Sequence, residues 1–169
     1  AAELWDWLAP VVRAGRPAEG CVWGPKGAGK SAVVRALFAE CSRQCGDDTT
    51  RMYTSTRAAP TTEVRFLYVD GRRAQSAFAL LHTVVAALSS ATVPKQGVGS
   101  AAMRDRLETQ LTQQDRQVVV AVDHVGEPET LDSETVFEQF APFQSSISCL
   151  AIGRENPAET AIGDRATIS

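Results

Sequence analysis

The sequence lacks any apolar stretch that approaches the roughly 18 residues needed to cross a membrane. Its N-terminus also lacks a basic segment followed by an apolar core. Both absences argue against a chain that is inserted in a membrane. We therefore expect a soluble, cytoplasmic protein that makes no contact with a membrane.

Lysine and paired cysteine are scarce as well. Three lysines stand beside fourteen arginines and the net charge is −3, which excludes a strongly basic surface for nucleic acid. No two cysteines form a CxxC pair, so neither a zinc motif nor a redox motif is indicated. We expect buried or inert thiols at the four cysteine positions, Cys21, Cys41, Cys45 and Cys149.

What is present is the composition of an ordinary globular protein, with 44% hydrophobic and 22% charged residues. A chain of 169 residues predicts a single domain, residues 1–169. Because the sequence begins without methionine and ends at Ser169, we expect it to be a piece of a longer protein.

Strand-like runs alternate with helix-like segments along the chain. The expected strands are residues 20–24, 64–70, 117–123 and 147–152. The expected helices are residues 3–12, 30–40, 74–88, 103–113 and 133–143, the last with Ser133 as its cap, and residues 46–62 are expected to form an exposed excursion. This alternation predicts an α/β fold with three αβα layers and a mostly parallel sheet.

One motif carries chemistry, because the residues from Gly24 to Ser31 (GPKGAGKS) fit the phosphate-loop pattern GxxxxGK[ST] at every fixed position. Glycines let successive amide N–H groups face one anion, and the lysine ammonium reaches the β and γ phosphates from the first turn of a helix. The alternative is a flexible glycine loop with a solvated Lys30. The motif predicts ATP or ADP as ligand, bound by Gly24, Pro25, Lys26, Gly27, Ala28, Gly29, Lys30, Ser31 and Ala32.

A phosphate loop also needs Mg²⁺, which the Ser31 hydroxyl and a carboxylate at the end of a neighbouring strand would hold. Asp70 and Asp123 each follow an apolar run. We favour Asp123, because its strand QVVVAV is the more continuously apolar, and we expect Asp70-Gly71 to be a turn that ends a strand. The bland alternative for Asp123 is a turn or cap residue.

The residue after Asp123 is His124, where a hydrolytic protein of this type would carry a glutamate to activate water. His124 could accept a proton itself, and Glu127 is close in sequence. The simpler expectation is a site that mainly binds nucleotide and switches, with slow turnover. Whether the chain is an enzyme therefore stays open, with ATP hydrolysis as the candidate activity.

These residues resemble the AAA+ ATPases, and among them the origin-recognition and cell-division-cycle initiators of DNA replication in archaea and eukaryotes. The lead-in helix, first strand, phosphate loop and first helix of that family are similar to residues 7–38, and its second strand and helix to residues 64–88. The run QVVVAVDHV resembles its Walker B strand, with His124 in place of glutamate. The resemblance implies the strand order 5-1-4-3-2, with a lid and last strand that could lie outside this chain.

The resemblance also implies further site residues. The run ISCLAIGREN is similar to the sensor-1 strand, which places Arg154, or Asn156 after a short shift, near the γ phosphate. The final residues GDRATIS resemble the segment that bears the arginine finger, which would be Arg165. The family's helical lid and winged-helix DNA-binding domain would follow Ser169, so DNA contact is expected only through regions absent from this chain.

Three functions remain as hypotheses. The first is an initiator-like ATPase core whose nucleotide state controls assembly on DNA, with self-association or other AAA+ subunits as partners. The second is a switch that binds nucleotide and scarcely hydrolyses it, motivated by His124. The third is a small-molecule kinase with Asp70 at its acceptor site. The order of strands separates the third from the others, because the AAA+ arrangement inserts the sensor strand between the phosphate-loop strand and the Asp123 strand.

Overall fold

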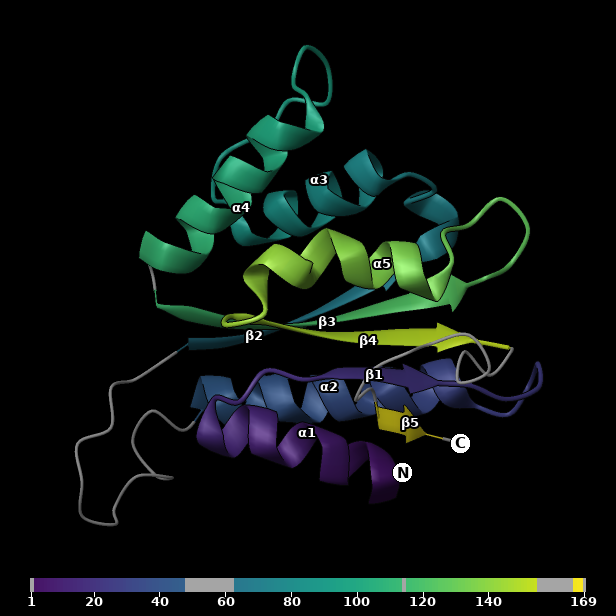
Figure 1. The fold of residues 1–169 in the computed structure, drawn as a ribbon. Coiled ribbons are helices and arrows are strands. Elements are labelled where there is room, and N and C mark those ends of the chain that lie inside the picture. Colours follow the sequence, from purple (N-terminus) through teal and green to yellow (C-terminus); the bar gives the residue numbers. More distant parts are fainter. Residues whose placement is uncertain (1, 48–62, 114, 155–165, 169) are drawn as a thin grey trace, which may run out of the picture.

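The computed structural model describes residues 2–47, 63–113, 115–154 and 166–168, and these form one parallel sheet with helices on both faces (Figure 1). The strands are β1 (Glu19–Val22), β2 (Glu63–Asp70), β3 (Arg116–Val125), β4 (Ile147–Gly153) and β5 (Ala166–Ile168). The α-helices are α1 (Ala2–Ala14), α2 (Lys30–Asp47), α3 (Ala77–Leu88), α4 (Ser100–Gln113) and α5 (Ser133–Phe140). Two short 3-10 helices, η1 (Gly71–Arg73) and η2 (Ala141–Phe143), follow β2 and α5. The predicted three-layer α/β class is therefore confirmed.

The sheet has the strand order β2-β3-β4-β1-β5. Read from the other edge, this is the predicted order 5-1-4-3-2, and it includes the last strand that the sequence left open. The strand β4 lies between β1 and β3, which is the arrangement expected of an AAA+ core. It is not the arrangement that the small-molecule kinase hypothesis required, and that hypothesis is set aside.

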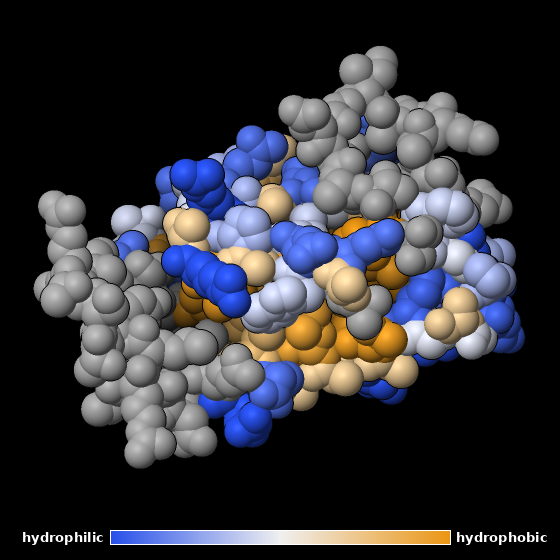
Figure 2. Space-filling model, turned by 90° about the horizontal axis from the view of Figure 1, so that it is seen from below, coloured by the Kyte–Doolittle hydropathy of each residue, from blue (hydrophilic) through white to orange (hydrophobic). Residues whose placement is uncertain are grey.

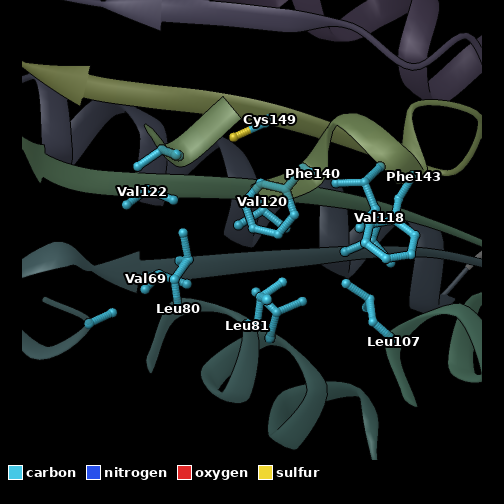
Figure 3. Close-up of a cluster of buried hydrophobic side chains, with 14 of the residues drawn as sticks. Val69, Leu80, Leu81, Leu107, Val118, Val120, Val122, Phe140, Phe143 and Cys149 are labelled. Atoms are coloured by element: carbon cyan, nitrogen blue, oxygen red, sulfur yellow. The ribbon is translucent and has the colours of Figure 1, made fainter. Parts of the chain in front are cut away.

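The strand β3 contributes to both hydrophobic cores, because its side chains alternate between the two faces of the sheet. Val118, Val120 and Val122 pack on one face with residues of α3, α4 and α5 (Figure 3). Val119 and Ala121 pack on the other face with residues of α1 and α2. Burying one valine contributes roughly 1.5 to 3 kcal/mol. A run of β-branched residues covered on both sides thus fixes the strand that carries Asp123.

The face formed by α1 and α2 is seen from below in Figure 2, where apolar surface in the middle is surrounded by hydrophilic side chains. Val33 of α2 is a large apolar side chain that is 40% exposed. Within the described part of the chain, no helix is both long enough and apolar enough to cross a membrane.

The ends of several helices differ from the sequence predictions because of local caps. The helix predicted from residue 74 begins at Ala77, since the Ser76 hydroxyl accepts from the Ala79 amide. The cap of α5 is Asp132, whose carboxylate accepts from Thr135 N at 2.7 Å, so the prediction of Ser133 as the cap was wrong.

Helix α2 extends to Asp47 and overlaps the start of the predicted excursion at residues 46–62. Residues 48–62 lie outside the described part of the chain. Three cysteines, Cys21, Cys41 and Cys149, are buried, as predicted for thiols that pack as small apolar side chains. Cys45 lies among residues whose side chains the structure does not describe.

Candidate functional site

The loop between β1 and α2 has the backbone shape that phosphate binding requires. Gly27 and Gly29 have φ angles of +86° and +82°, a region that residues with a side chain rarely adopt. A Cβ atom added at either glycine would meet nothing within 4 Å, so there is open space beside both residues. The helix starts at once, because Val33 N donates to Gly29 O at 2.9 Å. An anion bound here would face the positive end of α2, an 18-residue helix.

The Lys30 ammonium lies against this loop. Its Nζ donates to Gly24 O at 2.7 Å and to Pro25 O at 2.9 Å, which directs two of the three N–H groups of the ammonium at main-chain carbonyls. The side chain therefore arches back from the helix over the start of the loop. Lys26, the other lysine of the loop, is exposed.

Asp123 is the second anchor of the site and is only 4% exposed. Its Oδ1 accepts from the His124 amide at 2.8 Å, and its Oδ2 accepts a hydrogen bond from the Tyr68 hydroxyl. Tyr68 also shares a hydrogen bond with the Ser31 side chain. The structure thus brings together Ser31 and Asp123, the two residues predicted to hold magnesium, with one phenol between them. A hydroxyl and a carboxylate are oxygen ligands of the kind Mg²⁺ prefers, so the donor set fits the ion.

Tyr68 is a site residue that the sequence analysis missed. Burial, followed by the hydrogen bond to Asp123, raises the pKa of Tyr68 to about 12, although the bond with Ser31 opposes this. A signal was available in the strand VRFLYVD, because Val64, Phe66 and Tyr68 share one face. A tyrosine on an apolar face needs a partner for its hydroxyl.

Asp70 occupies the position on β2 that pairs with Asp123 on β3. Its carboxylate accepts from Arg72 N at 3.1 Å and from the Arg72 guanidinium at 3.0 and 2.8 Å, which caps the short helix η1. The hydrogen bonds from Arg72 lower the pKa of Asp70 to about 2, although burial opposes the shift. Asp70 therefore closes a turn, and its charge is directed to a surface arginine.

His124, near the end of β3, begins a network of charged side chains. Its backbone has a φ of +60°, and its Nδ1 lies 3.2 Å from Glu127 Oε1. The same carboxylate oxygen lies 3.0 Å from Arg154 Nε, which follows the end of β4. The Thr130 hydroxyl donates to His124 O at 2.7 Å and holds the unusual backbone turn.

The structure thus gathers four predicted residues, Asp123, His124, Glu127 and Arg154, at the carboxyl ends of β3 and β4. Since a carboxylate only accepts, Glu127 favours the His124 tautomer with the proton on Nδ1. The other ring nitrogen, Nε2, lies 3.7 Å from Asp123 Oδ2. Asn156 and Arg165, the remaining predicted residues, lie outside the described part of the chain.

Comparison with known proteins bears on this site and its fold. A sequence profile described as the AAA ATPase domain matches residues 3–147. A curated relative, the ORC1-type DNA replication protein 3 of Haloarcula marismortui, is 25% identical over 119 residues, which cover 70% of this chain and 27% of that protein. The chain thus spans about a quarter of the length of this relative.

Two solved structures are similar over 99% of this chain and 44% of theirs. They are the Aeropyrum pernix ORC1 protein in complex with DNA, at a TM-score of 0.73 and 17% identity, and Cdc6p from Pyrobaculum aerophilum, at a TM-score of 0.70 and 14% identity. At such low identities the likeness shows the fold alone. In both cases this chain covers less than half of the solved chain.

Proposed function

Because this chain belongs to the AAA ATPase domain family, we propose that it binds ATP or ADP together with Mg²⁺ at the loop that connects β1 to α2. The observation that carries the proposal is that the open glycine loop, Lys30, Ser31 and Asp123 lie together at the carboxyl ends of the parallel strands. Asp123 is more than ninety residues further along the chain.

In this proposal the main-chain amides of residues 24–31 and the Lys30 ammonium bind the phosphates. Ser31 and Asp123 would hold the magnesium ion, which would neutralise part of the phosphate charge. Ala32 adds the next amide of the first turn of α2. The side chain of Lys26 is exposed, so we assign only its main-chain amide to the ligand. The ligand class follows from charge, since the loop offers N–H donors, a cation and a helix N-terminus to an anion.

Hydrolysis by this site is slow in the proposed function. A water-activating carboxylate is expected directly after Asp123, where this chain has His124, and Glu127 is already bonded to His124 and Arg154. His124 offers a weaker substitute through Nε2. General bases contribute about 10² to 10⁴ in rate, so a poorly matched base lowers turnover and leaves binding intact.

The nucleotide state is further proposed to control assembly with other AAA+ subunits, or with copies of this chain, on DNA. Arg154 near the γ phosphate and Arg165 offered to a neighbouring nucleotide are the residues assigned to this control, with Asn156 as the alternative to Arg154. Support comes from the Aeropyrum pernix ORC1 protein, whose structure contains DNA. DNA contact is assigned to regions outside this chain.

Calorimetry with two lysine variants tests nucleotide binding. Lys30→Ala removes the ammonium that lies against Gly24 and Pro25, and we expect the affinity for Mg·ADP to fall at least tenfold. Lys26→Ala removes an equal charge from the same loop and should bind like the parent. No heat from Mg·ATP or Mg·ADP with the parent, or equal affinities in parent and Lys30→Ala, would contradict the proposal.

A second candidate function is a switch that binds nucleotide without hydrolysing it. His124 in place of the expected glutamate favours it. The measurement that separates the two is the ATPase rate of the parent under single-turnover conditions. A measurable rate that Lys30→Ala abolishes excludes the non-hydrolysing switch, whereas bound ATP that stays intact supports it.

A further inference from the structure

The side chain of Tyr68 is fixed at the interface of β2 and α2. The Arg35 guanidinium of α2 lies over the phenol ring, 4.6 Å from its centroid. Two residues earlier on the same face of β2, Phe66 packs against Phe38 of α2 with the ring centroids 5.4 Å apart. The ring thus has a packed position that does not depend on its hydroxyl group.

The Tyr68 hydroxyl connects its own strand β2 with β3 and α2. It donates to Asp123 Oδ2 at the end of β3, and it shares a hydrogen bond with Ser31 in the first turn of α2. Asp123 Oδ1 is held separately by the His124 amide at 2.8 Å. Both oxygens of the carboxylate therefore have a donor, and the donor on the Ser31 side is the phenol.

We propose that Tyr68 is a positioning residue of the magnesium site, whose hydroxyl sets the orientation of the Asp123 carboxylate relative to the Ser31 hydroxyl. The inference rests on the proposed function, since it concerns the ion that accompanies the nucleotide. Outer-shell hydrogen bonds that orient metal ligands are typically worth 10- to 100-fold in metal affinity. Without the phenol, the Asp123 side chain loses the donor that aligns Oδ2 with the start of α2.

The test is Tyr68→Phe, which removes the hydroxyl and keeps the ring beneath Arg35. Calorimetry measures ADP affinity in EDTA and in Mg²⁺, and the ratio of the two gives the enhancement by the ion. We expect the variant to bind ADP in EDTA as the parent does, and the enhancement to fall about tenfold. A matched control is Thr83→Val, which removes a hydroxyl that donates to Ala79 O within α3 and should leave both affinities unchanged.

The outcomes separate this inference from the function on which it rests. An unchanged enhancement in Tyr68→Phe overturns the positioning role, and a larger one means that the hydroxyl competes with the ion, which overturns it too. Both results leave nucleotide binding itself standing. A parent that binds no ADP under either condition contradicts the proposed function and the inference with it.

A spectroscopic readout tests the same contact even if Tyr68→Phe folds poorly. The chain has two tyrosines, Tyr53 and Tyr68, so Tyr53→Phe leaves Tyr68 as the single site for 3-fluorotyrosine labelling. We expect its ¹⁹F resonance to shift when Mg²⁺ is added to the ADP-saturated protein, because the acceptor of its hydrogen bond becomes an ion ligand. A resonance that Mg²⁺ leaves in place contradicts the proposal.

Discussion

The phosphate loop and the charged network at the end of β3 are built in different ways. The loop consists of consecutive residues, with open space beside Gly27 and Gly29 and with the Lys30 ammonium held against the carbonyls of Gly24 and Pro25. The network consists of side chains from two strand ends, in which Glu127 joins His124 to Arg154. A site made of main chain depends on a few glycines, whereas a site made of side chains can exchange one residue for another. The loop fits its motif fully, and the departure from the family pattern is His124 in the network.

The largest effect that would break this comparison is expected from Gly29→Ala. A Cβ at a φ of +82° costs about 1 to 2 kcal/mol and would stand where a phosphate oxygen approaches the amides. We expect the Mg·ADP affinity to fall by at least 10², measured by calorimetry. The control is Gly15→Ala, also at a positive φ with nothing within 4 Å, which follows α1.

Both glycine variants should lose a similar amount of stability in urea unfolding, and only Gly29→Ala should lose nucleotide affinity. Equal affinities in the two variants would mean that the loop backbone does not contact phosphate.

The position of the loop between a strand and a helix could be predicted from the sequence, because the motif is local. The strand β3 was predicted for a similar reason, since its valines are contiguous and covered on both faces. The strand order came from the family resemblance and not from any periodicity, because registers between distant strands leave no local pattern.

The network was predicted only as a set of residues. Nothing in the sequence indicates that Glu127 lies 3.0 Å from Arg154, because β4 and the helix before it separate them along the chain. Tyr68 was missed for the same reason, as its hydrogen-bond partners lie 37 residues before it and 55 residues after it. Such contacts depend on how α2 packs on β2. The sequence predicts that helices cover the sheet, but not which side chains meet.

The comparison can be sharpened on the network side with His124→Glu. A glutamate here supplies the carboxylate base that a hydrolytic site of this kind uses, so we expect the ATPase rate to rise by about 10-fold to 10²-fold. Binding of Mg·ADP should change little, because the loop is untouched. Single-turnover hydrolysis of radiolabelled ATP measures the rate.

The matched variant His124→Gln removes the titratable ring without adding a carboxylate, and it should not exceed the parent. If the parent already turns over quickly and His124→Glu is slower, the histidine itself is the better base in this network. In that case His124 would replace the glutamate as the base, and the network would support hydrolysis without a carboxylate at this position.

The smallest effect concerns Asp70, which pairs with Asp123 across β2 and β3 but bonds to Arg72. Its pKa is lowered from 3.8 to about 2, so the ionised form stabilises the fold above about pH 4, and this contribution is lost as the pH falls through 2. Because Arg72 is 57% exposed, solvent screening limits it to less than about 1 kcal/mol. Urea unfolding of Asp70→Asn and the parent should differ at pH 6, and the difference should shrink towards pH 2. Nucleotide affinity at pH 7 should be the same in both, and a variant that binds Mg·ADP more weakly would mean that Asp70 belongs to the ion site after all.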